Sequence, residues 1–182
     1  MEYAGRYSVE KPSTETYRNY LDTLVILVQW LIAGNYDVRL LIGDFADIPV
    51  IREFKHLLQE RLGEYDRSRI SDEPITSVEQ LLSQLTRTDL VVATRFHNVL
   101  LALLNNKPVV AISFHHKCWS LMSAMGLSEY CLDINDLRAD DLIAKMRGVE
   151  ENTDSLKSLI REREGAFRAA LDEQYELISK YT

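Results

Sequence analysis

The sequence predicts an α/β fold, a Rossmann-like doubly wound domain in which helices cover both faces of a parallel sheet. Short apolar runs typical of buried strands alternate along the chain with segments whose apolar residues recur at helical spacing. The strand-like runs 89–94 and 108–112 are apolar almost throughout, as expected for parallel strands buried on both sides. No repeat, low-complexity run or Pro/Gly/Ser linker divides the 182 residues, so one domain over 1–182 is expected.

The first half of the chain is expected to supply strands over 37–43 and 69–70 and helices over 16–34, 48–63 and 77–86. Apolar residues recur on one side of the first helix, and Gly34-Asn35 ends it. Ser77 followed by Gln80 is a capping-box pattern, which opens the third helix. Residues 3–9 are expected to be the end of a strand that precedes the first helix.

The second half is expected to supply strands over 89–94, 108–112 and 129–132. Helices are expected over 98–104, 140–147 and 153–180, and a further helix follows the segment 113–117 and ends at Met125. Gly126 ends the helix that follows the strand 108–112. The last helix is strongly charged on one face. Its apolar stripe is expected to lie on the sheet domain; the stripe consists of Leu156, Ile160, Phe167, Leu171 and Ile178.

Composition excludes several classes of protein. A net charge of -7 and a pI near 5.1 give no overall attraction to nucleic acid. Two cysteines, Cys118 and Cys131, are too few for the disulfide framework of a small secreted domain, so a reducing cytoplasm is expected. The most apolar stretch, 24–33, falls short of the ~20 residues that span a bilayer.

Polar residues follow two neighbouring strands of the predicted sheet. Thr94 ends the strand 89–94, and Arg95 and His97 follow it at the start of a helix whose unpaired N–H groups favour an anion. The segment after the strand 108–112 carries His115, His116 and Lys117. Because ligands of open parallel sheets bind beyond the carboxyl ends of the strands, these residues predict a site for a compact, multiply charged anion.

The stretch 88–142 resembles the C-terminal domain of the polysaccharide pyruvyl transferase family. The resemblance rests on the run Asp89-Leu-Val-Val-Ala-Thr-Arg-Phe-His97, on 106–112, on Lys117, and on Met125-Gly-Leu-Ser128 followed by Asp133. It implies one half of a two-domain GT-B-like fold, and transfer of the pyruvyl group of phosphoenolpyruvate to a saccharide or lipid-linked saccharide as a ketal. The family's first domain is missing from these residues, so a separate N-terminal domain or a homo-oligomer partner is expected to complete the site. Contact with a membrane is expected only through the acceptor.

The resemblance also implies roles for single residues. No cofactor is expected, and no metal either, because His97, His115 and His116 are accompanied by no spaced carboxylate or thiolate set and no His-x-x-x-His. Arg95 would bind the phosphate or carboxylate of the donor, since its planar guanidinium suits bidentate contacts. His97, with an ordinary pKa near ~6.5, would be the general acid. Secondary contacts are expected from Thr94, Lys117, His115, His116 and Arg6.

Other interpretations remain open on the same residues. Arg95 and His97 at a helix start are also compatible with capping and packing, and so are the adjacent His115 and His116. The chain would alternatively be a GT-B glycosyltransferase half that binds a nucleotide sugar, or a truncated non-catalytic domain that dimerises. Gly43-Asp44 follows a strand, yet no Gly-x-Gly-x-x-Gly or Walker A sequence supports nucleotide binding.

Overall fold

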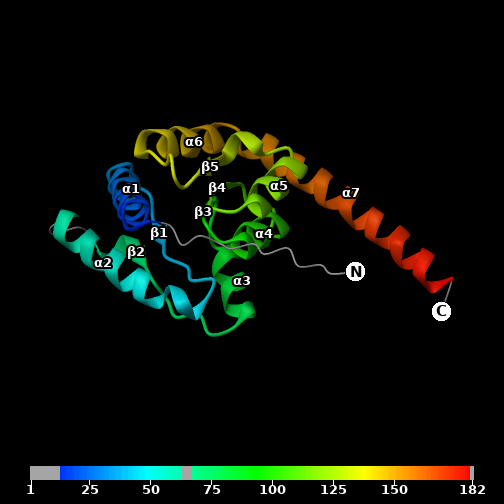
Figure 1. Ribbon diagram of the computed structural model, residues 1–182, viewed down its shortest axis with the longest axis horizontal. Helices are drawn as coiled ribbons and strands as arrows, with labels where there is room; N and C mark the ends of the chain where they lie inside the picture. Colours follow the sequence, from blue (N-terminus) through cyan, green and yellow to red (C-terminus); the bar gives the residue numbers. More distant parts are fainter. Residues whose placement is uncertain (1–12, 63–66, 181–182) are drawn as a thin grey trace.

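A computed structural model describes residues 13–62 and 67–180, in which short parallel strands alternate with helices (Figure 1). Two strands, β1 (Val38–Arg39) and β2 (Ile70–Ser71), form one parallel pair. Three more form a parallel sheet in the order β3-β4-β5; they are β3 (Val91–Ala93), β4 (Val109–Ser113) and β5 (Cys131–Asp133). The α/β class with parallel strands is therefore confirmed. The strand pairs in the described part of the chain form two sheets, so one continuous doubly wound sheet is not seen.

The helices occupy the segments that the apolar spacing predicts. They are α1 (Thr14–Ala33), α2 (Ile48–Leu62), α3 (Val78–Thr86), α4 (Phe96–Leu104), α5 (His116–Ala124), α6 (Ala139–Glu151) and α7 (Thr153–Ser179), with single 3-10 turns η1 (Phe45–Asp47), η2 (Arg67–Arg69) and η3 (Ser128–Tyr130). In Figure 1, α6 lies on one side of the three-stranded sheet and α4 on the other. Helix α1 contacts both α2 and α6, so it joins the two halves of the molecule.

The larger hydrophobic core surrounds the three-stranded sheet. All five residues of β4 are buried, because helices cover this central strand on both faces. Its core partners include Val99 from α4, Met122 from α5 and Leu142 from α6, and each of these residues is 0% exposed. The apolar run that predicts this strand is thus explained by burial on both sides.

A smaller core lies between α1, α2 and the β1-β2 pair. It consists of Leu21, Val25, Val28, Phe54 and Leu58. Val38 and Ile70, which are paired across β1 and β2, pack against it with partial burial. Because α1 also contributes Leu27 to the larger core, the two cores share one helix.

The helix ends agree with the sequence in position and differ in detail. Gly34 has an ordinary φ of -79°, and it is Asn35 that adopts the left-handed conformation, with φ of 67°. Gly126, which follows the C-cap Met125 of α5, does have a positive φ of 73°. The Ser77 side chain accepts a hydrogen bond from Gln80 N at 3.3 Å, whereas the Gln80 side chain accepts from Thr76 N and not from Ser77.

Three predictions are wrong in part. Of the strand expected over 129–132, residues 129–130 belong to η3, and β5 begins at Cys131. The strand expected over 37–43 is limited to Val38–Arg39, because the chain then turns toward η1 and Gly43 comes against the Asn98 side chain. Of the apolar residues of α7 that are expected to lie on the domain, only the first two do so. Leu156 and Ile160 are buried, whereas Phe167 and Leu171 are exposed. Ile178 is exposed as well. The strand expected over 3–9 lies outside the described residues.

Candidate functional site

A pocket of about 240 Å³ opens where β3 and β4 end. The two strands are parallel neighbours with Ala93 opposite Ala111, so the residues that follow them meet at one edge of the sheet. The pocket is lined by Thr94, Phe96, Phe114, His115, Lys117 and Cys118. Three of the predicted site residues, Thr94, His115 and Lys117, are thereby brought together. Because α4 and α5 both begin at this edge, their N-terminal N–H groups add positive potential beside Lys117.

Arg95 lies next to this pocket without lining it. Its Nε and Nη2 atoms donate to the two carboxylate oxygens of Asp47, at 2.7 and 2.5 Å, and Nη1 is 3.6 Å from Asp44. The hydrogen bonds to Asp47 raise the pKa of Arg95, which remains a cation. The arginine is thus held in a bidentate pair, and it faces the loop after β1.

His97 occupies the first turn of α4, since this helix begins at Phe96, two residues earlier than expected. Its side chain is exposed, and its ring meets the Phe96 ring edge-on with 5.5 Å between centroids. Phe96 lines the pocket and His97 does not. Neither residue of the Arg-x-His pair therefore lines the pocket.

His115 is the N-cap of α5. Its Nδ1 atom accepts a hydrogen bond from Lys117 N at 3.2 Å, so the ring is unprotonated at this nitrogen. Desolvation, followed by the proximity of His116 and Lys117, lowers the pKa of His115 and favours the neutral form. The His116 ring lies 4.2 Å from the His115 ring, centroid to centroid. The buried Ser113 hydroxyl donates to His115 O at 2.8 Å and fixes the turn that precedes the cap.

Two further residues of this region carry no motif in the sequence that would predict their role. Tyr20, on α1, forms a hydrogen bond of 2.9 Å between its hydroxyl and Thr94 Oγ1. Desolvation by burial raises the pKa of Tyr20, so its hydroxyl stays protonated. Asp47 is the second. Its only sequence signal is its place after a predicted strand, because a contact over 48 residues leaves no local pattern.

Neither cysteine has the environment of a reactive thiolate. Cys118 is 3% exposed beneath the pocket, and desolvation raises its pKa. Burial raises the pKa of Cys131 to about 12. Both thiols therefore remain protonated and serve as packing groups in the core.

Three further expectations concern Arg6, a metal site and a membrane-spanning helix. Arg6 lies outside the described residues. Within 13–62 and 67–180, no three His, Cys, Asp or Glu side chains are grouped so that they could hold a metal ion. Nor does any helix in those ranges combine the length and apolar character needed to cross a membrane.

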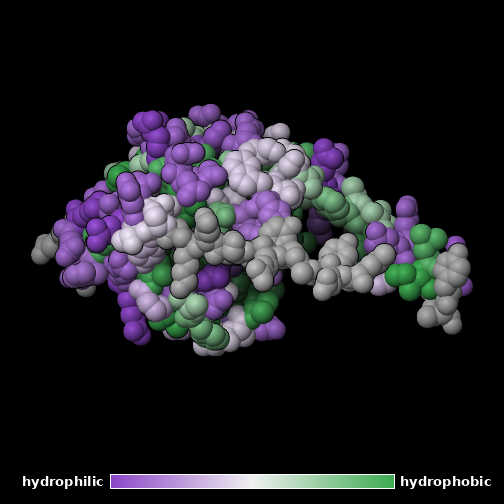
Figure 2. Space-filling model, in the orientation of Figure 1, coloured by the Kyte–Doolittle hydropathy of each residue, from purple (hydrophilic) through white to green (hydrophobic). Residues whose placement is uncertain are grey.

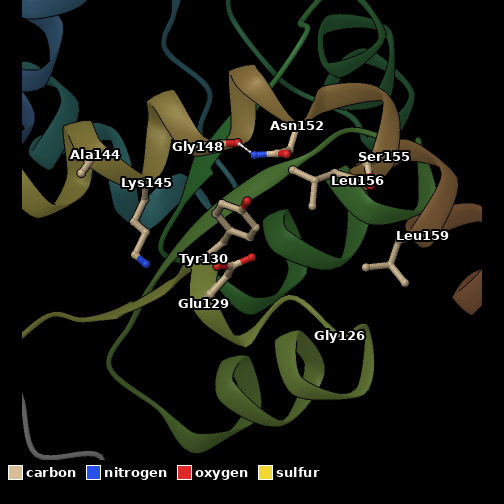
Figure 3. Close-up of a pocket in the computed structure, with 10 residues that line it drawn as sticks. All are labelled: Gly126, Glu129, Tyr130, Ala144, Lys145, Gly148, Asn152, Ser155, Leu156 and Leu159. Carbon is tan, nitrogen blue, oxygen red and sulfur yellow. Dashed lines mark hydrogen bonds between the residues drawn. The ribbon is translucent and has the colours of Figure 1, made fainter.

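A second and larger pocket, of about 400 Å³, lies between η3, α6 and the start of α7 (Figure 3). Lys145 from α6 and Glu129 from η3 extend toward each other at one end, and Tyr130 lies between the two elements. Asn152 Nδ2 donates to Gly148 O at 2.8 Å, which occupies that amide. None of the predicted site residues lines this pocket.

Comparison with known proteins supports the resemblance. The family model described as polysaccharide pyruvyl transferase matches residues 3–116, which include Thr94 to His116 at this edge; Lys117 is the next residue after the match. The amylovoran biosynthesis protein AmsJ of Erwinia amylovora is 29% identical over 103 residues, which cover 54% of this chain and 25% of AmsJ. The matched part is thus about a quarter of the length of that curated relative. No solved structure matches the chain.

Proposed function

This chain belongs to the polysaccharide pyruvyl transferase family, and from that premise we propose that its pocket at the ends of β3 and β4 binds phosphoenolpyruvate. The observation that carries the proposal is the meeting of Thr94, His115 and Lys117 in one pocket beside Arg95. The family implies a transferase that acts on a saccharide in polysaccharide biosynthesis. The donor, its site and the full reaction of this chain are our proposal.

The pocket has the two kinds of lining that phosphoenolpyruvate requires. Lys117 and the N-terminus of α5 suit the phosphate or the carboxylate, since both supply N–H donors and positive potential. Phe96 and Phe114 offer an apolar wall for the methylene carbon. Thr94 adds a hydroxyl, whose orientation the hydrogen bond with Tyr20 restricts.

Arg95 would contribute without losing its pair with Asp47. Asp47 occupies Nε and Nη2, whereas the Asp44 carboxylate stands at 3.6 Å from Nη1, beyond hydrogen-bond distance. A donor anion would take the place of Asp44 at Nη1, and Asp47 would keep the guanidinium in orientation. The bidentate pair thus prepares one edge of Arg95 for an anion.

The chemistry would follow from protonation of the donor. A proton from His97 at the methylene carbon turns it into a methyl group and leaves an oxocarbenium-like centre at C2. One saccharide hydroxyl attacks C2, phosphate leaves, and a second hydroxyl closes the ketal. One hydroxyl proton replaces the proton taken from His97, and the other departs with the phosphate. His97 would have to turn toward the pocket to give this proton; its ring now contacts the ring of Phe96, which lines the pocket.

We further propose that this chain supplies the donor-binding half of a two-domain GT-B-like enzyme. The support is the position of the pocket at the carboxyl edge of a parallel sheet, together with the match to a quarter of AmsJ. The acceptor saccharide would then contact a second domain.

Isothermal titration of phosphoenolpyruvate into the full chain tests the donor site. Saturable binding is expected. Lys117→Ala and Arg95→Ala should each lower the affinity for phosphoenolpyruvate at least about tenfold, because each removes a positive charge. His97→Ala should lower the affinity as well, because it removes a proton-bearing group. Arg87→Ala is the matched control: Arg87 is an exposed arginine that precedes β3 and therefore lies at the opposite edge of the sheet. It should bind like the unchanged chain.

Three results would count against the proposal. They are no binding by the unchanged chain, equal binding by all variants, and binding of a UDP or GDP sugar in preference to phosphoenolpyruvate. The last result would favour a glycosyltransferase half.

A further inference from the structure

The second half of α7 exposes a line of large apolar side chains. Phe167, Leu171 and Tyr175 are four residues apart, so they lie on one face of the helix, and they are 47%, 51% and 68% exposed. We call these three residues the α7 stripe. The stripe continues the face that buries Leu156 and Ile160 on the domain, and Figure 1 shows α7 extending away from the rest of the molecule beyond that point.

This part of α7 has little to hold it in place by itself. From Arg161 to Lys180 every residue except Glu164 is exposed. In water most of the stability of a protein helix comes from packing of its apolar face, which these residues lack, and Gly165 lowers helix propensity further. Figure 2 shows hydrophobic side chains gathered at the end of α7 that points away from the domain. A partner that covers the stripe would supply the missing packing energy.

The charges beside the stripe indicate what that partner is. The basic residues Arg161, Arg163 and Arg168 come first, and Asp172, Glu173 and Glu176 follow. With Glu162, Glu164 and Lys180 included, residues 161–170 carry three positive and two negative charges, and 171–180 carry one positive and three negative. The helix is therefore net positive in its first half and net negative in its second.

We propose that the α7 stripe pairs with the same stripe of a second copy of this chain, in antiparallel orientation. Antiparallel pairing sets the positive half of each helix against the negative half of the other, whereas parallel pairing sets like against like. A two-fold axis near Ala170 brings Arg168 of each copy to Asp172 of the other, on the same flank of the stripe.

Sedimentation equilibrium of the full chain over about a thousandfold range of concentration tests the pairing. A monomer–dimer equilibrium is expected, and Leu171→Glu should weaken it at least about tenfold by burying a charge in the stripe. Leu104→Glu is the matched control, since Leu104 is a leucine of equal exposure, 52%, at the end of α4. It should dimerise normally. A chain that stays monomeric, or a dimer that Leu171→Glu leaves unchanged, overturns the proposal.

Two further measurements test the orientation. Arg168→Glu should weaken the dimer and the double variant Arg168→Glu, Asp172→Arg should restore it, because the swap recreates both contacts across the axis. A short bis-maleimide should link Ala170→Cys to its own copy and fail with Leu177→Cys, which antiparallel helices separate by about 20 Å. Equal linkage at both positions would indicate a parallel pair and contradict the proposal. None of these results depends on donor binding.

Discussion

Two carboxylates determine which N–H donors of Arg95 are available to a ligand. Asp47 takes the Nε and Nη2 donors in a bidentate pair, and Asp44 stands near Nη1. The Arg95 side chain is 39% exposed, so solvent screens part of this attraction. The pair therefore orients the guanidinium more than it stabilises the fold.

A double-mutant cycle between Arg95 and Asp47 measures this pair. Arg95→Ala, Asp47→Ala and the double variant are expected to show a coupling energy of about 1 kcal/mol in urea unfolding, the upper range for exposed pairs, since the geometry is bidentate. The pair Arg138 and Asp141, whose atoms are 4.0 Å apart, is a control that should show almost none. Strict additivity at Arg95 and Asp47 would contradict the orienting role.

His115 makes the start of α5 sensitive to pH. Desolvation lowers its pKa from the ordinary 6.5, so the folded chain binds fewer protons at this ring than the unfolded chain does. Its contribution to stability is fully present above about pH 6.5 and is lost as pH falls through the lower folded pKa, when Nδ1 is protonated and stops accepting from Lys117 N.

The variant His115→Asn checks this dependence, because asparagine also caps helices and does not titrate. Its urea midpoint is expected to fall less than that of the unchanged chain between pH 7 and pH 5, roughly. Parallel pH profiles for the two proteins would show that the imidazole is not the titrating cap.

Among the elements, the turn between β1 and α2 is held by a close contact with α4. A Cβ atom on Gly43 would come within 2.7 Å of Asn98 Nδ2 and 2.8 Å of Asn98 Cγ, so only glycine fits while Asn98 keeps its rotamer. The same turn carries Asp44 and Asp47 to Arg95. Close packing at Gly43 therefore contributes to the position of both carboxylates.

Gly43→Ala is expected to reduce the free energy of unfolding by about 1–3 kcal/mol through overpacking. In an Asn98→Ala background the same change should have a much smaller effect, because the colliding amide is gone. Gly165→Ala, with nothing within 4 Å of the added Cβ, should instead stabilise the exposed part of α7 by ~0.5–1 kcal/mol. An equal loss at Gly43 in both backgrounds would show that the contact with Asn98 is not responsible.

For the molecule as a whole, α1 couples the two cores. Its Leu21, Val25 and Val28 belong to the smaller core, and its Leu27 to the larger one. Unfolding of either core therefore exposes one side of the same helix, and a single cooperative transition is expected.

Leu58→Ala in the smaller core and Leu142→Ala in the larger one test this coupling, since both side chains are 0% exposed. Each should destabilise by about 2–5 kcal/mol. Circular dichroism and the fluorescence of Trp30 and Trp119 should give the same midpoint in both variants. Separate transitions in Leu58→Ala would show that the β1-β2 half unfolds independently.

Much of the secondary structure is predictable because it depends on local patterns. The apolar run 108–112 and the helical spacing in 16–34 each match an element of the structure to within two residues. Errors occur where a distant contact decides the outcome. The strand 37–43 is cut to Val38–Arg39 as the turn at Gly43 docks on Asn98, and no pattern within those residues signals this.

The candidate site is predictable to a similar degree. Thr94, His115 and Lys117 meet as expected, because parallel strands end at the same edge. The separation of Arg95 from that pocket depends on Asp47, 48 residues earlier in the chain, and the hydrogen bond on Thr94 depends on Tyr20, 74 residues earlier. Such partners become visible only when the elements are packed.

The order of residues along the chain was sufficient for the α/β class and for the edge at which the polar residues gather, since both follow from periodicity. It was sufficient for the family as well, through the resemblance of its motif residues. Packing settled which donors of Arg95 are occupied, which nitrogen of His115 caps α5, and where the apolar face of α7 leaves the domain. Each of these depends on the distance between side chains on different elements, or on how far a helix extends beyond its neighbours, and folding alone sets those distances.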